Sequence, residues 1–158
     1  MITATIILIL STAMFFFYFQ VTCQKILRRQ FDQEYFRSIA HANRLEFPSL
    51  RKSLEEFGAP VYYSQLRSML KCDFLALTYL LKHVENANRR YSKEEHFLLL
   101  YFRFQSLSLA VRHLLGVSDS KAILSMTSIL QYFANVVGQR VSNVSFANST
   151  AADYLLSL

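Results

Sequence analysis

The chain is poor in residues that make turns, metal sites and cross-links: its 158 residues include three glycines, two prolines, two cysteines and no tryptophan. So few glycines and prolines leave little room for the tight turns that join β-strands, and the composition therefore predicts an all-α fold. Three scattered glycines also exclude a glycine-rich phosphate-binding loop. Cys23 and Cys72 cannot form a metal site by themselves, and we expect them to remain reduced thiols.

Sequence patterns of enzyme active sites are missing as well. There is no G-x-S-x-G motif, and Cys72 lies in the middle of a predicted helix rather than on a strained turn or at a helix N-terminus. His83 and His96 could approach one another across an antiparallel helix pair, together with the nearby Glu85, Glu94 and Glu95. Their spacing matches no zinc-binding pattern, so we expect a solvated helix end instead. The sequence predicts a non-catalytic protein without metal or cofactor.

One apolar run distinguishes the N-terminus. Residues 2–19 read ITATIILILSTAMFFFYF, without charge, proline or glycine. A helix of this length, extended by the next three residues, crosses a hydrocarbon core of about 30 Å. Neither a basic stretch before the run nor a small-residue cleavage site after it marks a secretory signal. We therefore expect a permanent transmembrane anchor over residues 1–23.

The flanks of this run predict its orientation. Lys25, Arg28 and Arg29 follow it directly, and positive residues stay on the cytoplasmic side of a membrane. The N-terminus should therefore lie outside and the remaining chain in the cytoplasm. Tyr18 and Phe19 are expected at the membrane interface. The formal net charge of +6 fits attraction to anionic lipids and does not require nucleic acid.

The segment after the anchor, residues 24–47, has no proline or glycine and repeats apolar residues at helical spacing. These residues are Leu27, Phe31, Tyr35 and Ile39. They predict one continuous helix from residue 2 to residue 45, whose cytoplasmic half is an amphipathic stalk packed against the following domain. Pro48 is expected to end it.

Residues 48–141 are predicted to form a small bundle of one short and three long helices. The short helix covers residues 49–57, and the long ones begin near Val61, Ser92 and Ser118 or Asp119. Ser92 and Glu95 form a capping box. The tail, residues 142–158, is expected to be polar and irregular with an apolar end.

The helix that begins at Ser92 is apolar on nearly its whole circumference because residues 97–102 form an unbroken apolar hexad. Such a helix is surrounded by its own domain, by a partner or by a membrane. A second span is disfavoured because Arg103 and Gln105 interrupt the run.

Asp73 stands within the apolar stretch MLKCDFLALTYLL. A carboxylate that faces a core needs a partner, and Arg103 or Arg112 on the next long helix is expected to form an ion pair with it. The alternative is a functional acid with a raised pKa in a pocket.

One stretch, SLEEFGAPVYYSQLRSML, resembles a helix-turn-helix with Gly58 in the turn. The resemblance implies a DNA-binding regulator tethered to the membrane. It covers less than a fifth of the chain, and it places Ser64 and Arg67 where that motif buries aliphatic residues.

These features together favour an accessory subunit that stabilises a larger membrane complex, with photosynthetic or respiratory electron-transport complexes as the expected hosts. Its partners would be other membrane subunits and the lipid bilayer, with nucleic acid unlikely as a partner. A membrane-tethered adaptor or scaffold is the alternative, and the DNA-binding regulator is a weaker one.

Overall fold

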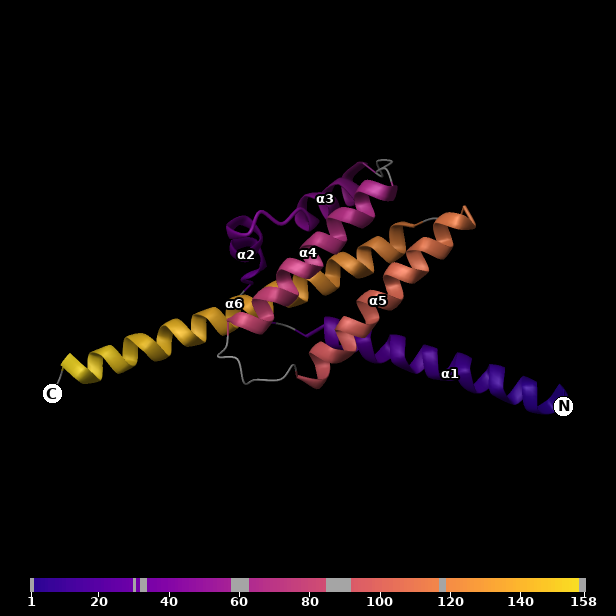
Figure 1. Cartoon of the computed structure of the whole chain (residues 1–158), viewed down its shortest axis with the longest axis horizontal. Helices are drawn as coiled ribbons and strands as arrows, with labels where there is room; N and C mark the ends of the chain where they lie inside the picture. The colour runs from indigo at the N-terminus through magenta and orange to yellow at the C-terminus, as the bar shows by residue number, and fades with distance from the viewer. Residues whose placement is uncertain are drawn as a thin grey trace.

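The computed structural model describes residues 2–29, 31, 34–57, 63–84, 92–116 and 119–156, with side chains up to residue 143. Within these ranges the chain forms six helices and no strand, which confirms the all-α prediction (Figure 1). The helices are α1 (Ile2–Leu27), α2 (Phe36–Ala42), α3 (Phe47–Phe57), α4 (Tyr63–His83), α5 (Lys93–Leu114) and α6 (Ser120–Leu156). One long apolar N-terminal helix is thus followed by a helical bundle.

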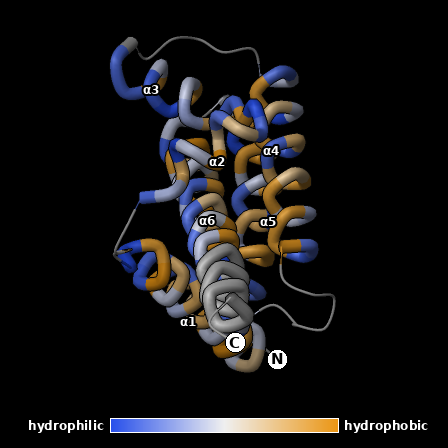
Figure 2. Tube along the Cα trace, turned by 90° about the vertical axis from the view of Figure 1, so that its left-hand side faces the viewer, coloured by the Kyte–Doolittle hydropathy of each residue, from blue (hydrophilic) through white to orange (hydrophobic). Residues whose placement is uncertain are grey.

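Helix α6 lies at the centre of the bundle and packs against each of the other five described helices. Seen from the end of the molecule, α4 and α5 lie on one side of α6, α2 and α3 lie above it and α1 lies below (Figure 2). The side chains of Ile129, Leu130 and Phe133 on α6 are fully buried. Burying a side chain of this size contributes about 1.5–3 kcal/mol, so α6 supplies much of the core energy.

Helices α4 and α5 close the core from the other side. Leu70 and Leu77 of α4 and Leu98 of α5 are fully buried. The rings of Phe74 and Phe102 are stacked with their centroids 4.0 Å apart. The prediction of three long helices packed together is confirmed.

The predicted continuous stalk over residues 24–47 is wrong. Helix α1 ends at Leu27, and a separate short helix, α2, begins at Phe36. The interruption comes from tertiary packing, since no proline or glycine breaks the sequence here. The Asn135 side chain of α6 accepts a hydrogen bond from the Phe36 backbone N–H (2.8 Å), and Phe31 and Ile39 pack against the core. The segment is therefore folded onto the bundle, as expected, but not as a straight helix.

A close backbone approach fixes where this segment lies. Gly138 of α6 faces Tyr35, and a Cβ atom built on Gly138 would lie 2.1 Å from the Tyr35 Cβ. Carbon atoms do not approach so closely, so only glycine allows the contact. Helix α2 ends at Ala42. Two residues later Arg44 has a left-handed φ of 51°, and the Leu45 N–H donates a hydrogen bond to the Ala40 carbonyl oxygen (2.9 Å), as at a helix C-terminus.

The prediction of an irregular tail is also wrong. Helix α6 continues through residues 142–156 and extends away from the bundle, at the end opposite to the free end of α1 (Figure 1). The polar residues of this stretch suggested a loop. They include neither proline nor glycine, however, so nothing in the sequence stops the helix.

Replacing Gly138 by alanine tests the contact between α6 and Tyr35. In a solvated helix this change would stabilise, since glycine costs about 0.5–1 kcal/mol relative to alanine. Here we expect a loss of about 1–3 kcal/mol, because the new methyl group overpacks the contact. Thermal unfolding in mild detergent, followed by circular dichroism, measures the change. In a Tyr35→Gly background the same substitution should become neutral or stabilising; an equal loss in both backgrounds would contradict the close approach.

Candidate membrane interface and polar junction

Helix α1 is the one helix in the described part of the chain that is long and apolar enough to cross a membrane. Residues 2–18 of this helix are exposed, and Phe19 and Cys23 are its buried residues. Length and composition thus support a single-pass membrane protein, while the direction of crossing remains a prediction from the flanking charges.

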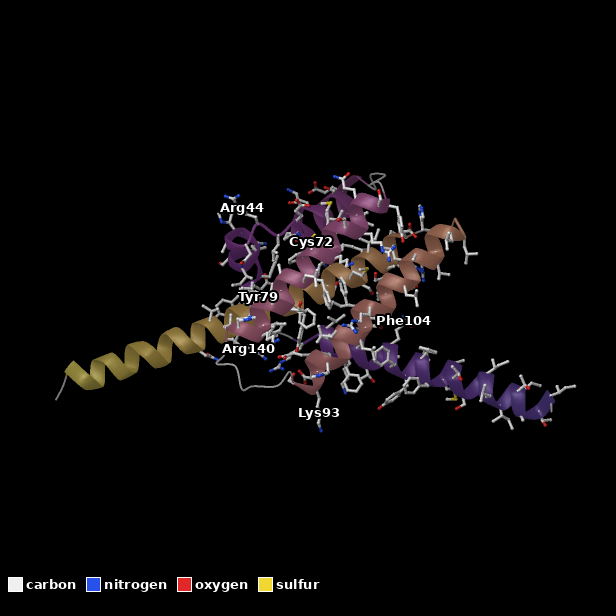
Figure 3. All side chains as sticks on the ribbon, viewed as in Figure 1. Arg44, Cys72, Tyr79, Lys93, Phe104 and Arg140 are labelled. Carbon is white, nitrogen blue, oxygen red and sulfur yellow. The ribbon has the colours of Figure 1, made fainter. Side chains whose placement is uncertain are left out.

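The inner half of α1 is part of the folded bundle. The rings of Phe16 and Phe104 are stacked at 5.4 Å, and the Phe19 ring meets Tyr101 edge-on at 6.0 Å. One turn further along, Cys23 is fully buried, with its sulfur 4.0 Å from the Phe97 carbonyl oxygen. Successive contacts on α1 meet earlier residues of α5, so the two chains run in opposite directions where the helices cross (Figure 3).

This packing separates the residues predicted at the membrane interface. Tyr18 is 73% exposed, and Lys25 and Arg28 are exposed, as an interfacial position requires. Phe19 instead points into the bundle and is only 9% exposed. Arg29 lies beyond the helix end and bonds Glu94 of α5.

A cluster of charged and polar side chains joins the exit of α1 to α5 and α6. We call it the polar junction; it consists of Arg29, Glu94, Glu95, Tyr132 and Arg140. Glu94 Oε2 accepts hydrogen bonds from Arg29 Nη1 and from the Tyr132 hydroxyl, each at 3.1 Å. Burial, and next the negative charge of Glu94, raise the pKa of Tyr132 to about 12. Tyr132 is therefore a protonated donor at neutral pH and not a base.

Glu95 forms the buried half of the polar junction. The predicted capping box is confirmed. Glu95 Oε2 accepts a hydrogen bond from the Ser92 backbone N–H (3.1 Å), and the Ser92 hydroxyl oxygen accepts one from the Glu95 backbone N–H. The other carboxylate oxygen pairs with Arg140 of α6, and both side chains are largely buried. Arg140 also donates to the Leu81 carbonyl of α4 (3.1 Å). One arginine thus ties together the start of α5, the end of α4 and α6.

An open groove of about 600 Å³ runs along the polar junction. Each carboxylate that lines it already accepts a hydrogen bond from an arginine. A general base needs a free carboxylate or imidazole within reach of a substrate proton. The arrangement therefore suits a structural junction better than a catalytic site.

Asp73 has partners other than the predicted arginines. Its Oδ2 accepts hydrogen bonds from the backbone N–H groups of Glu46 (2.9 Å) and Phe47 (2.7 Å), at the start of α3. It pairs with neither Arg103 nor Arg112 within the described residues. Burial raises the pKa of Asp73 more than these two bonds lower it. Asp73 is thus a helix cap supplied by a neighbouring helix, a role that sequence spacing could not reveal.

The histidine arrangement considered for a metal does not form in the described ranges. The His83 ring is stacked on Tyr79, and its Nδ1 lies 2.8 Å from the Tyr79 carbonyl oxygen. No group of three potential ligands occurs among these residues. Glu85 lies outside them.

The helix-turn-helix prediction remains untested, because its turn at Gly58 falls outside the described residues. Helices α3 and α4 flank that turn, and Ser64 and Arg67 are exposed on α4. Leu66 and Leu70 of α4 are buried in the bundle.

Sequence reasoning missed three residues of α6 that organise the protein: Asn135, Gly138 and Arg140. Each interrupts the apolar pattern of that helix. A lone glycine in a helix usually marks a close contact, and a buried amide usually has a polar partner. The sequence signal for these contacts was therefore the interruption of the apolar pattern.

No family model, curated protein or solved structure matches the chain.

Substitutions at Asp73 test its role as a cap. Asp73→Ala should lower the free energy of unfolding by about 1–3 kcal/mol, because two backbone donors lose their acceptor. Asp73→Asn keeps a carbonyl oxygen at the site and should cost much less. Chemical unfolding in mild detergent measures both variants.

The pH dependence of the free energy of unfolding, compared between the wild type and Asp73→Asn, gives a second readout. The folded-state pKa of Asp73 is raised above 3.8, so the unfolded chain ionises first as the pH rises. Stability contributed by protonated Asp73 is full below pH 3.8 and is lost as the pH rises through the folded-state pKa. The wild type should therefore lose stability relative to Asp73→Asn from acid to neutral pH. The opposite trend, or a large loss in Asp73→Asn, would support the arginine ion pair.

Proposed function

We propose that the protein is a non-catalytic single-pass membrane subunit that helps to assemble or stabilise a larger membrane complex. The observation that carries the proposal is that residues 2–18 of α1 are charge-free and exposed, in a helix long and apolar enough to cross a membrane. The proposed topology places the N-terminus outside and the bundle in the cytoplasm, in keeping with Lys25 and Arg28 behind the span.

The α1 face that packs on α5 continues into the outer half of the span. Phe16, Phe19 and Cys23 contact α5, and the same helical spacing leads back to Thr12, Leu8 and Thr5. Large aromatic side chains occupy this face where α5 covers it. Further out this face carries the small hydroxyl residues Thr12 and Thr5, one on either side of Leu8. Small residues let helices approach closely within a membrane, so this outer face suits the span of another subunit.

The engaged carboxylates of the polar junction support the non-catalytic part of the proposal. Glu94 and Glu95 stabilise the fold, and Tyr132 stays protonated. We propose as host the complex expected from the sequence, a photosynthetic or respiratory electron-transport complex. Identification of the proteins that co-purify with the chain tests this host.

Thr12→Phe tests the proposed subunit contact. Thr12 is exposed, so the bulky ring should leave the bundle intact while blocking close approach of a partner span. Loss of a contact of about 1–2 kcal/mol lowers recovery with the complex roughly tenfold. Native membranes are solubilised in mild detergent, separated by size and analysed by mass spectrometry. Leu10→Phe, about 160° around α1 from Thr12, is the matched control on the opposite, exposed face and should not change recovery.

The same experiment distinguishes the alternatives. The wild type should migrate with a large complex at fixed stoichiometry. Recovery in variable, sub-stoichiometric amounts would favour a membrane-tethered adaptor. Migration as a small free species would contradict the subunit proposal and make DNA binding by residues 46–90 the next assay.

A further inference from the structure

The outer face of α5 carries a second apolar surface. Its large side chains are between 38% and 84% exposed and follow one another in steps of three and four. We call this surface the α5 stripe; it consists of Phe97, Leu100, Phe104, Leu107, Val111 and Leu114. Such spacing places all six on one side of a helix whose other side is buried against the bundle. The stripe is about 25 Å long, at 1.5 Å per residue.

We propose that the α5 stripe lies in the membrane leaflet that meets the bundle, so that α5 is an interfacial helix beside the α1 span. The proposal rests on the part of the proposed function that places α1 across the bilayer. It does not depend on which complex hosts the protein.

The contact between α1 and α5 sets the depth of the stripe. Phe104 belongs to the stripe and is stacked on Phe16 of α1, and Phe97 lies against Phe19. Phe16 and Phe19 belong to the charge-free run that is needed to cross the bilayer. If that run is in the membrane, the part of α5 in contact with it lies at the level of the near leaflet.

The length of α1 leads to the same conclusion. Residues 2–15, the part beyond the α5 contact, rise about 21 Å as a helix. The hydrocarbon core is about 30 Å thick, so roughly 9 Å is missing. An interfacial helix buries its apolar face about 5–10 Å into the leaflet, which accounts for the difference. The α5 stripe thus completes the membrane-embedded surface that the outer part of α1 is too short to supply.

The directions of the two helices fit this placement. From their contact, α1 and α5 diverge widely, so α1 can cross the bilayer with a moderate tilt while α5 follows its surface (Figure 1). Phe104 lies on the part of α5 that faces α1 (Figure 3).

A group of cations borders the stripe on the side away from α1. Arg103 of α5 and Arg67 and Lys71 of α4 line a groove of about 290 Å³ whose floor includes Phe74 and Phe102. All three are exposed, and none forms an ion pair with another described residue. Cations beside an apolar interfacial surface attract anionic lipid headgroups. The lipid occupant is therefore expected to be enriched in anionic species.

Depth-dependent quenching tests the proposal directly, since the chain has no tryptophan and each introduced one reports alone. Leu107→Trp places the probe in the stripe, Ile7→Trp in the span and Tyr79→Trp on α4. The three replaced side chains are similarly exposed, at 65%, 67% and 62%. Each full-length variant is reconstituted in phosphatidylcholine and phosphatidylglycerol vesicles. Brominated acyl chains quench tryptophan in the bilayer, and iodide quenches it in water.

We expect brominated lipid to quench Leu107→Trp and Ile7→Trp, and iodide to quench Tyr79→Trp. Iodide quenching of Leu107→Trp with lipid quenching of Ile7→Trp would overturn the α5 inference while leaving the anchor intact. Protection of Leu107→Trp from both quenchers would also overturn it, because a second copy of the chain would then cover the stripe. Iodide quenching of Ile7→Trp would show instead that the anchor itself is wrong.

The basic groove is tested in the Leu107→Trp protein by combining Arg67→Gln, Lys71→Gln and Arg103→Gln. Quenching by brominated phosphatidylglycerol should exceed quenching by brominated phosphatidylcholine in the parent, and this preference should disappear in the triple variant. Arg37→Gln, Lys52→Gln and Lys82→Gln remove the same charge elsewhere and should leave the preference unchanged. If both triple variants lose the preference for phosphatidylglycerol equally, the preference depends on net charge alone, which would contradict a headgroup site.

Discussion

The contact between the inner half of α1 and the first half of α5 is the interaction on which the rest of the structure depends. It requires one helix to satisfy two environments. The outer residues of α1 are exposed and apolar, whereas Phe19 and Cys23 further along are buried in the bundle. The bundle is therefore held directly against the apolar helix rather than on a flexible tether. If α1 crosses a membrane as proposed, this contact determines which faces of the bundle meet it.

Buried polar groups hold the segments that follow α1 in place. Asn135 caps α2, Asp73 caps α3, and Glu95 with Arg140 joins α4, α5 and α6. In each case the partner comes from another helix. A buried polar group without a partner costs about 1–3 kcal/mol, so these bonds select one arrangement of otherwise similar apolar helices.

The sequence was sufficient for the features that depend on local pattern. The apolar run predicted α1, the Ser92 capping box predicted the start of α5, and helical spacing predicted three long helices. The sequence did not predict the features that depend on contacts between residues far apart in the chain. Nothing near Leu27 ends a helix, and only Asn135 and Gly138, about a hundred residues later, explain the fold-back. The partners of Asp73 were missed because backbone N–H groups carry no sequence signature.

The reactivity of Cys23 tests the central claim most directly, with the exposed Cys72 as an internal reference. In mild detergent, N-ethylmaleimide should label Cys72 rapidly and Cys23 only after denaturation. Gln24→Cys in a Cys23→Ala background places a thiol at nearly the same depth on the exposed side of α1 and should react readily. Equal protection of both α1 positions would mean that detergent alone shields them. Rapid labelling of Cys23 in the folded protein would show that α1 does not pack against α5.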